Sequence, residues 1–235
     1  MAPLVDQLKI VQARIGAACE AGGRDPSSVQ LLAVSKTFPA QAVREVARAG
    51  QRDFGENYIQ EGVDKITQLQ SDASMPQLVW HCIGPIQSNK TRLVAEHFDW
   101  VHTVDRLKIA QRLNDQRPAH LSPLQVCIQV NTDGGATKSG VAPQEVATLA
   151  QAIGALPRLR LRGLMTIPDP VDGWDAQVAL HRRASDLFQA LRTQLLLPDF
   201  DTLSMGMTAD LEAAIHAGST MVRVGTAIFG QRPKA

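Results

Sequence analysis

Cysteine is scarce in this chain: only Cys19, Cys82 and Cys127 occur among 235 residues. Their number is odd, long stretches separate them, and no C-x-x-C pair is present, which argues against both a disulfide framework and a zinc site. Isolated cysteines of this kind fit a reducing compartment. We therefore expect a cytoplasmic location.

The sequence also lacks a long apolar run and an excess of charge of either sign. No apolar run approaches the ~18 residues that cross a bilayer, and Asp6 and Lys9 stand where a signal peptide would need its apolar region. Lys and Arg total 24 against 23 Asp and Glu, so binding to nucleic acid or to a membrane surface has no evident electrostatic source. With 44% hydrophobic and 20% charged residues, we expect residues 1–235 to form one folded domain that is soluble and not exported.

Several motifs that mark common enzyme classes are absent. The chain contains no G-x-G-x-x-G, P-loop, G-x-S-x-G or H-E-x-x-H sequence. Asp133 and Asp169 lie at predicted strand ends but lack the ligand cluster that a metal ion needs. The sequence therefore predicts neither a dinucleotide fold nor a metal site.

What the sequence does have is a regular alternation of short apolar strands and amphipathic helices. Leu4, Leu8, Val11 and Ile15 follow the spacing of one helical face, in a segment that stops at Gly22-Gly23. Strands are then predicted at 29–36, 52–55, 78–83, 100–104, 124–130, 160–165, 202–205 and 221–224. The helices between them are predicted at 41–50, from about 58, from 88, from 105, from 143, at 174–196 and at 208–217.

This order of elements predicts an α/β fold, a single (β/α)8 TIM barrel with an extra N-terminal helix. Strands separated by helices of this length run parallel with right-handed crossovers, and such units close most simply into a barrel. A doubly wound open sheet is the alternative. Polar and glycine-rich residues after almost every strand favour the barrel, because barrel sites are built at the carboxyl ends of the strands.

Lys36 stands out because it terminates an apolar strand. Burial disfavours an ammonium group and lowers its pKa, which suits a lysine that attacks an aldehyde to form a Schiff base. A lysine that extends to solvent from the barrel rim is the alternative. Arg223, inside the last strand, points either into the barrel or at the helix layer, and a buried guanidinium needs an acceptor. A structural salt bridge would also explain it.

The ends of the last two strands carry a set of small residues suited to holding a phosphate group. Backbone amides and a hydroxyl in these two loops are where barrel enzymes commonly bind phosphate, and the residues here are Ser204, Gly206, Gly225 and Thr226. Asn57, after the second strand, could bind a ligand or cap a turn. His81 could be a general acid or base, or a satisfied core histidine.

Together the blocks LLAVSKTFP, FGENYIQE, WHCIGPIQSNK, VNTDGGATKSGV and LSMGMTADLEAAIHAGSTMVRVGTAIFG resemble the pyridoxal phosphate homeostasis proteins. They run in family order over nearly the whole chain. The resemblance implies a barrel similar to the N-terminal domain of alanine racemase, with pyridoxal 5′-phosphate bound as a Schiff base. The sequence departs from the family pattern at Pro85, where a histidine is usual, and at residues 134–137, where acidic residues are common.

The resemblance also implies a role for each candidate residue. Lys36 would form the Schiff base, Asn57 would lie beside the cofactor ring, and Arg223 would lie by the pyridine nitrogen. The phosphate would be held by Ser204, Gly206, Gly225 and Thr226. An arginine does not readily give up its proton, so the ring nitrogen would stay unprotonated and the ring would be a poor electron sink.

These features favour a protein that holds the cofactor over one that turns over a substrate. Racemisation needs a base on each face of the substrate, and the tyrosine-bearing second domain of alanine racemase is not expected here; Tyr58 is the only tyrosine. We predict a monomeric carrier or buffer in intracellular pyridoxal phosphate homeostasis that serves apo forms of dependent enzymes. The alternative is an amino acid racemase or lyase that uses Lys36 with His81 or Tyr58 as its bases.

Overall fold

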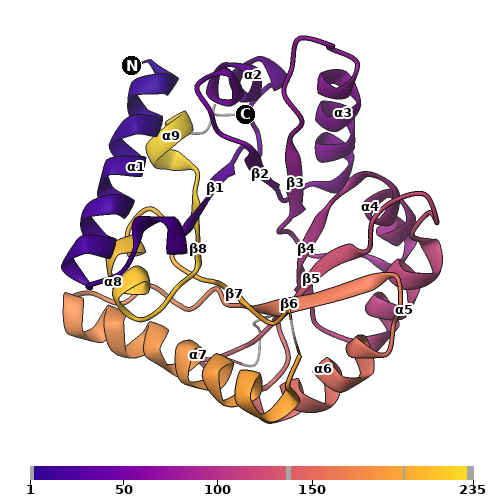
Figure 1. The fold of residues 1–235 in the computed structure, drawn as a ribbon, viewed down its shortest axis with the longest axis vertical. Coiled ribbons are helices and arrows are strands. Elements are labelled where there is room, and N and C mark those ends of the chain that lie inside the picture. Colours follow the sequence, from indigo (N-terminus) through magenta and orange to yellow (C-terminus); the bar gives the residue numbers. More distant parts are fainter. Residues whose placement is uncertain (1–2, 136–138, 198, 232–235) are drawn as a thin grey trace.

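A ring of parallel strands surrounded by helices forms the centre of the molecule (Figure 1). The computed structural model describes residues 3–135, 139–197 and 199–231. Its strands are β1 Gln30–Val34, β2 Asp53–Glu56, β3 Val79–Cys82, β4 Trp100–Val104, β5 Leu124–Gln129, β6 Leu159–Met165, β7 Thr202–Ser204 and β8 Met221–Val224. Its helices are α1 Leu4–Ala21, α2 Ala40–Arg48, α3 Ile59–Gln70, α4 Thr91–His97, α5 Leu107–Gln116, α6 Val146–Gly154, α7 Trp174–Leu195, α8 Leu211–His216 and α9 Thr226–Phe229.

The sheet closes on itself, which confirms the predicted barrel and excludes the open sheet. In β1, Ala33 is paired with Phe54 of β2 on one side and with Val224 of β8 on the other. All neighbouring strands are parallel and follow the order of the chain. Their carboxyl ends therefore lie at one end of the barrel, which we call the C-terminal end.

Several predicted boundaries differ from the structure, three of them at the starts of helices. The helices expected from 88 and from 143 begin as single 3-10 turns, at Ser88–Lys90 and Pro143–Glu145. The helix expected from 208 begins only at Leu211, because the Asp210 carboxylate accepts a hydrogen bond from the Met207 N–H and closes a turn there. Helix α9 was not predicted.

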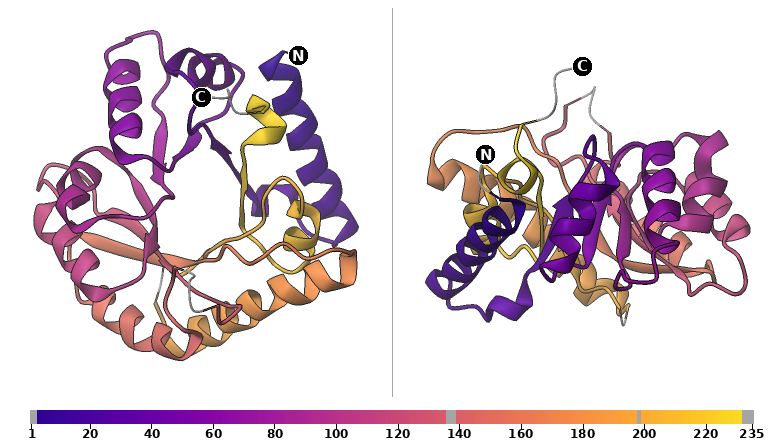
Figure 2. Two further views of the ribbon diagram at one scale, coloured as in Figure 1. Left: turned by 180° about the vertical axis from the view of Figure 1, so that it is seen from behind. Right: turned by 90° about the horizontal axis from the view of Figure 1, so that it is seen from above.

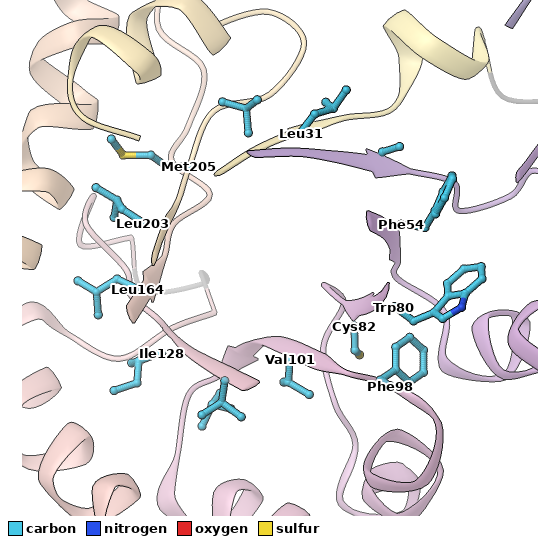
Figure 3. Close-up of a cluster of buried hydrophobic side chains, with 14 of the residues drawn as sticks. Leu31, Phe54, Trp80, Cys82, Phe98, Val101, Ile128, Leu164, Leu203 and Met205 are labelled. Carbon is cyan, nitrogen blue, oxygen red and sulfur yellow. The ribbon is translucent and has the colours of Figure 1, made fainter. Parts of the chain in front are cut away.

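The apolar core fills the space between the strand ring and the helices. Leu164, Leu203 and Ile128 point away from the barrel centre toward the helix layer (Figure 3). The predicted N-terminal helix α1 buries one face and lies along α8 and α9 (Figure 2). Arg14 of α1 forms a paired hydrogen bond with the Glu212 carboxylate of α8, at 2.8 and 2.9 Å.

The interior of the barrel is lined by the alternate set of side chains. These include two apolar clusters, one of Leu32, Val34, Ile83 and Met221 and the other of Trp100, Cys127 and Met165. Buried polar side chains share this interior, among them His81, His102, Ser204 and Arg223. Buried polar groups need hydrogen-bond partners, and their pairing determines the chemistry of the site.

Candidate functional site

All seven predicted site residues lie at or near the carboxyl ends of four consecutive strands, in the ring order β7, β8, β1, β2. The backbone holds these strand ends together. The Ser35 N–H donates to Gly55 O at 3.0 Å, and the Arg223 N–H donates to Gly206 O at 3.0 Å. The fold therefore brings Lys36 and Asn57 to the same end of the barrel as Gly206, Gly225 and Thr226.

A tight turn places Lys36 at this end. The strand stops at Val34 because the Phe38 N–H turns back to Ser35 O at 3.1 Å. Thr37 takes a left-handed conformation, φ 67°, which is costly for a β-branched residue. The Glu61 carboxylate accepts the Thr37 N–H at 2.6 Å and so stabilises this turn. Lys36 is partly buried beside it.

A buried ion cluster supports the turn from behind. Lys65 of α3 donates to Glu56 at 2.8 Å, to Glu61 at 2.6 Å and to the Ser35 carbonyl at 2.8 Å. The Ser35 hydroxyl donates to the same Glu56 oxygen at 2.6 Å. Burial raises the pKa of Glu56, and the Lys65 ammonium opposes that rise. Sequence analysis missed this cluster, although Glu61 and Lys65 have the i, i+4 spacing of a helical ion pair.

Arg223 points into the barrel and is only 5% exposed. Its guanidinium donates to the Ser204 carbonyl at 2.7 Å, to the Ser204 hydroxyl at 2.8 Å and to the Thr166 carbonyl at 2.7 Å. The hydrogen-bond acceptors of this guanidinium are therefore neutral oxygens. They take the place of the carboxylate that a structural salt bridge would have supplied. Burial lowers the pKa of Arg223 to about 10, so the side chain still carries its proton at neutral pH.

Ser204 connects Arg223 to two buried histidines. His102 Nδ1 lies 3.0 Å from the Ser204 hydroxyl, His102 Nε2 lies 2.9 Å from His81 Nδ1, and His81 Nε2 lies 3.0 Å from the Asp53 carboxylate. Both ring nitrogens of each histidine are thus engaged. Sequence analysis considered His81 but missed Asp53 and His102, whose inward orientation depends on strand register.

The two glycines of the predicted phosphate loops are closely packed, and Gly206 is the more constrained of the two. A Cβ on Gly206, which has φ +92°, would lie 2.5 Å from the Ala214 side chain, and one on Gly225 would lie 3.1 Å from the Val34 carbonyl. Thr226 is exposed and begins α9, whereas the Ser204 hydroxyl is buried and faces Arg223. Phosphate binding by these residues stays a prediction.

Asn57 is partly buried directly after β2. A Cβ on Gly84 would lie 2.1 Å from the Asn57 carbonyl, so the loop after β3 rests against the Asn57 backbone and admits only glycine. Pro85, the departure from the family pattern, is exposed. In the loop after β5, Asn131 binds the Gly135 carbonyl at 2.8 Å, while residues 136–138, including Lys138, lie outside the described residues.

Fold and site together define a racemase-type barrel with a lysine after its first strand and a buried arginine on its last. The alanine racemase N-terminal domain model matches residues 21–233. The alanine racemase of Corynebacterium glutamicum has a similar fold, with a TM-score of 0.65 and 18% identity over 98% of this chain and 62% of its own.

Proteins with higher sequence identity identify the particular family within this class. A protein of Pseudomonas aeruginosa named pyridoxal phosphate homeostasis protein is 58% identical over 99% of this chain and 97% of its own length. A protein of the same name from Vibrio cholerae is 56% identical over 99% of this chain and 98% of its own length. The structure of PipY from Synechococcus elongatus, described with PLP bound, has a TM-score of 0.81 and 34% identity over 97% of this chain and 100% of its own. The chain belongs to the pyridoxal phosphate homeostasis protein family within the alanine racemase N-terminal domain family, which confirms the resemblance of its sequence blocks.

Proposed function

We propose that this chain binds pyridoxal 5′-phosphate covalently through Lys36, as a Schiff base, and acts as a carrier or buffer of the cofactor in intracellular homeostasis. The observation that carries the proposal is the buried, protonated Arg223 held at the C-terminal end of the barrel, one strand from the turn that bears Lys36. The PLP-bound structure of PipY, a relative with the same fold, supports the choice of ligand.

The residues at this end fit the three functional groups of the cofactor. The cofactor supplies an aldehyde that condenses with a primary amine, and Lys36 is an amine at the mouth of the barrel. Arg223 presents donors to a ring nitrogen, and the first turn of α9 presents backbone N–H groups to a phosphate. Within the described residues, the buried Thr166 hydroxyl oxygen beside Arg223 has no hydrogen-bond partner, which marks a polar position that a ligand could satisfy.

The same geometry favours holding the cofactor over amino acid turnover. Arg223 keeps its proton, so it leaves a ring nitrogen unprotonated and the ring a weak electron sink. His81, a candidate second base, is fully buried and engaged at both ring nitrogens. Tyr58, the other candidate, is 55% exposed and precedes α3. These placements support a carrier over a racemase or lyase.

Localisation and partners complete the proposal. No helix in the described part of the chain is long and apolar enough to cross a membrane. We propose a cytoplasmic monomer, a single domain of residues 1–235, that delivers the cofactor to apo forms of dependent enzymes and binds no nucleic acid. The near-neutral charge balance supports the last point.

Reductive trapping tests the site. Wild-type protein mixed with pyridoxal 5′-phosphate is expected to absorb visible light, and borohydride reduction followed by mass mapping is expected to place the adduct on Lys36. Lys36→Ala should lose the covalent adduct and retain weaker binding, since the other proposed contacts come from the ends of β2, β7 and β8. Lys108→Ala, an exposed lysine on α5, serves as the control and should behave as wild type.

Two results would overturn this assignment. The first is an unchanged adduct yield in Lys36→Ala. The second, which would instead favour the racemase or lyase, is solvent deuterium incorporation at the Cα of an amino acid at ordinary enzyme rates.

A further inference from the structure

A continuous hydrogen-bonded relay crosses the inside of the barrel. It runs from Asp53 through His81, His102 and Ser204 to Arg223, with successive donor–acceptor distances of 3.0, 2.9, 3.0 and 2.8 Å. Its ends stand on β2 and β8, and it passes through β3, β4 and β7; β4 and β8 face each other across the ring (Figure 1). The Asp53 end lines a cavity of about 370 Å³ at the N-terminal end of the barrel, opposite the proposed cofactor site.

The two ends of the relay determine which nitrogens carry protons when both histidines are neutral. A guanidinium only donates and a carboxylate only accepts. Arg223 therefore donates to the Ser204 oxygen, the Ser204 hydroxyl donates to His102 Nδ1, His102 Nε2–H donates to His81 Nδ1, and His81 Nε2–H donates to Asp53. Every bond then points the same way, and both histidines are Nε2–H tautomers.

One additional proton reverses the middle of the relay. With His81 doubly protonated, Nε2–H still donates to Asp53, while Nδ1–H now donates to His102 Nε2. His102 must then carry its proton on Nδ1 and donate it to the Ser204 oxygen, which already accepts from Arg223. The Ser204 hydroxyl proton turns away from His102 toward another acceptor. The net change is one proton gained from solvent, and only N–H and O–H bonds are exchanged.

Of the two histidines, His81 is the one with a carboxylate at a ring nitrogen, which makes it the candidate site for the extra proton. Burial, and then the charges of His81 and Arg223, hold the pKa of His102 well below its ordinary value, so His102 remains neutral. The His81 ring stacks on the Trp100 ring at 5.3 Å, an arrangement that suits an imidazolium. Several other titratable or charged groups face this part of the interior or act on it electrostatically. They are Asp53 of β2, Asp99 just before β4, His102 of β4, Cys127 of β5, Arg162 of β6 and Arg223 of β8.

We propose that occupation of the C-terminal end by pyridoxal 5′-phosphate is coupled to the uptake of one proton by His81. The inference rests on the proposed function. A protonated His81 adds a positive charge to the barrel and makes His102 compete with Arg223 for the Ser204 oxygen, so Arg223 gains from an acceptor supplied by the ligand. By reciprocity, an anionic ligand beside Arg223 favours the protonated relay. His81 and His102 are then positioning residues that act through Ser204 on Arg223.

Calorimetry of pyridoxal 5′-phosphate binding in buffers of different ionisation enthalpy tests the coupling. Wild type and the control His120→Asn, an exposed histidine, should take up the same number of protons. His81→Asn should take up fewer protons on binding, by up to about one. Its affinity for the ligand should also fall less steeply as the pH rises, with a difference from wild type of up to about tenfold per pH unit. Protonation of the ligand itself is common to all variants and cancels in the difference.

Two further measurements keep the test decisive. Asp53→Asn keeps an oxygen acceptor for the His81 Nε2 proton but removes the negative charge that an imidazolium would face, so it should also reduce proton uptake. This variant covers a failure of His81→Asn to fold. Nitrogen-15 spectra of the ligand-free protein at high pH should show His102 as the Nε2–H tautomer.

The outcomes separate the two proposals. Equal proton uptake by wild type, His81→Asn and Asp53→Asn, with binding intact, overturns the coupling alone, and an Nδ1–H tautomer of His102 at high pH does the same. Absence of any binding by wild type overturns the proposed function and the coupling with it.

Discussion

Replacement of Lys65 by methionine is predicted to remove the support beneath the Lys36 turn. Lys65 is 7% exposed in its side chain and its partner Glu56 is fully buried, so Lys65→Met leaves a carboxylate in the core without its cation. Removing one partner of a buried pair costs about 3–5 kcal/mol. At about 2–4 °C per kcal/mol for a chain of this size, the melting temperature should fall by about 6–20 °C.

The loss should depend on pH in a direction that the burial of Glu56 fixes. Burial raises the pKa of Glu56 in the folded chain, so the folded state holds that proton more tightly than the unfolded state, and stability falls as the pH rises from the unfolded toward the folded value. Lys65 opposes the shift, and its removal raises the pKa further. Lys65→Met should therefore lose more stability at pH 8 than at pH 5.

Urea unfolding at both pH values measures this, with Arg44→Met as the matched control. Arg44 pairs with Asp72 at 3.1 Å, but both side chains are partly exposed, so the control should lose no more than about 1 kcal/mol. The reasoning would be refuted by equal losses in Lys65→Met and Arg44→Met at pH 8, or by a Lys65→Met loss that is no larger at pH 8 than at pH 5.

Two further predictions concern packing and thiol reactivity. In urea unfolding, Gly163→Ala should destabilise the barrel by more than about 3 kcal/mol, because the new Cβ would lie 1.8 Å from the Thr202 carbonyl. Gly16→Ala, in open space within α1, should instead stabilise the barrel by about 0.5–1 kcal/mol. Similar stabilities of the two variants would contradict this prediction. Burial raises the pKa of Cys82 and of Cys127 to about 12, so neither thiol should react with a disulfide reagent at pH 8 until the chain unfolds, and rapid labelling of the native protein would contradict the structure.

Much of the fold was accessible from the sequence because its determinants are local. Apolar runs such as 124–130 mark strands, and the spacing of Leu8, Val11 and Ile15 marks a helical face that is buried in the structure. Two of the boundaries that differed depend on local backbone geometry. The Asp210 carboxylate delays the start of α8, and the left-handed Thr37 ends β1 before Lys36.

The positions of the candidate site residues also followed from the sequence. Lys36, Asn57 and Arg223 could be assigned to one end of the molecule because parallel strands in a barrel place their carboxyl ends together. Their surroundings could not be assigned. Whether Arg223 faces the barrel interior or the helix layer depends on strand register, and its acceptors come from other strands.

The sequence by itself determined the order of strands and helices, the barrel they form and the residues at the C-terminal end, because hydrophobic period and turn chemistry act between near neighbours. Only the tertiary structure decided the contacts inside the barrel. His102 binds Ser204 across 102 positions of the chain, and Lys65 binds Glu56 beneath Lys36. Such pairs form because closure of the ring buries polar side chains that must find partners wherever the register places them, and no local pattern records that choice.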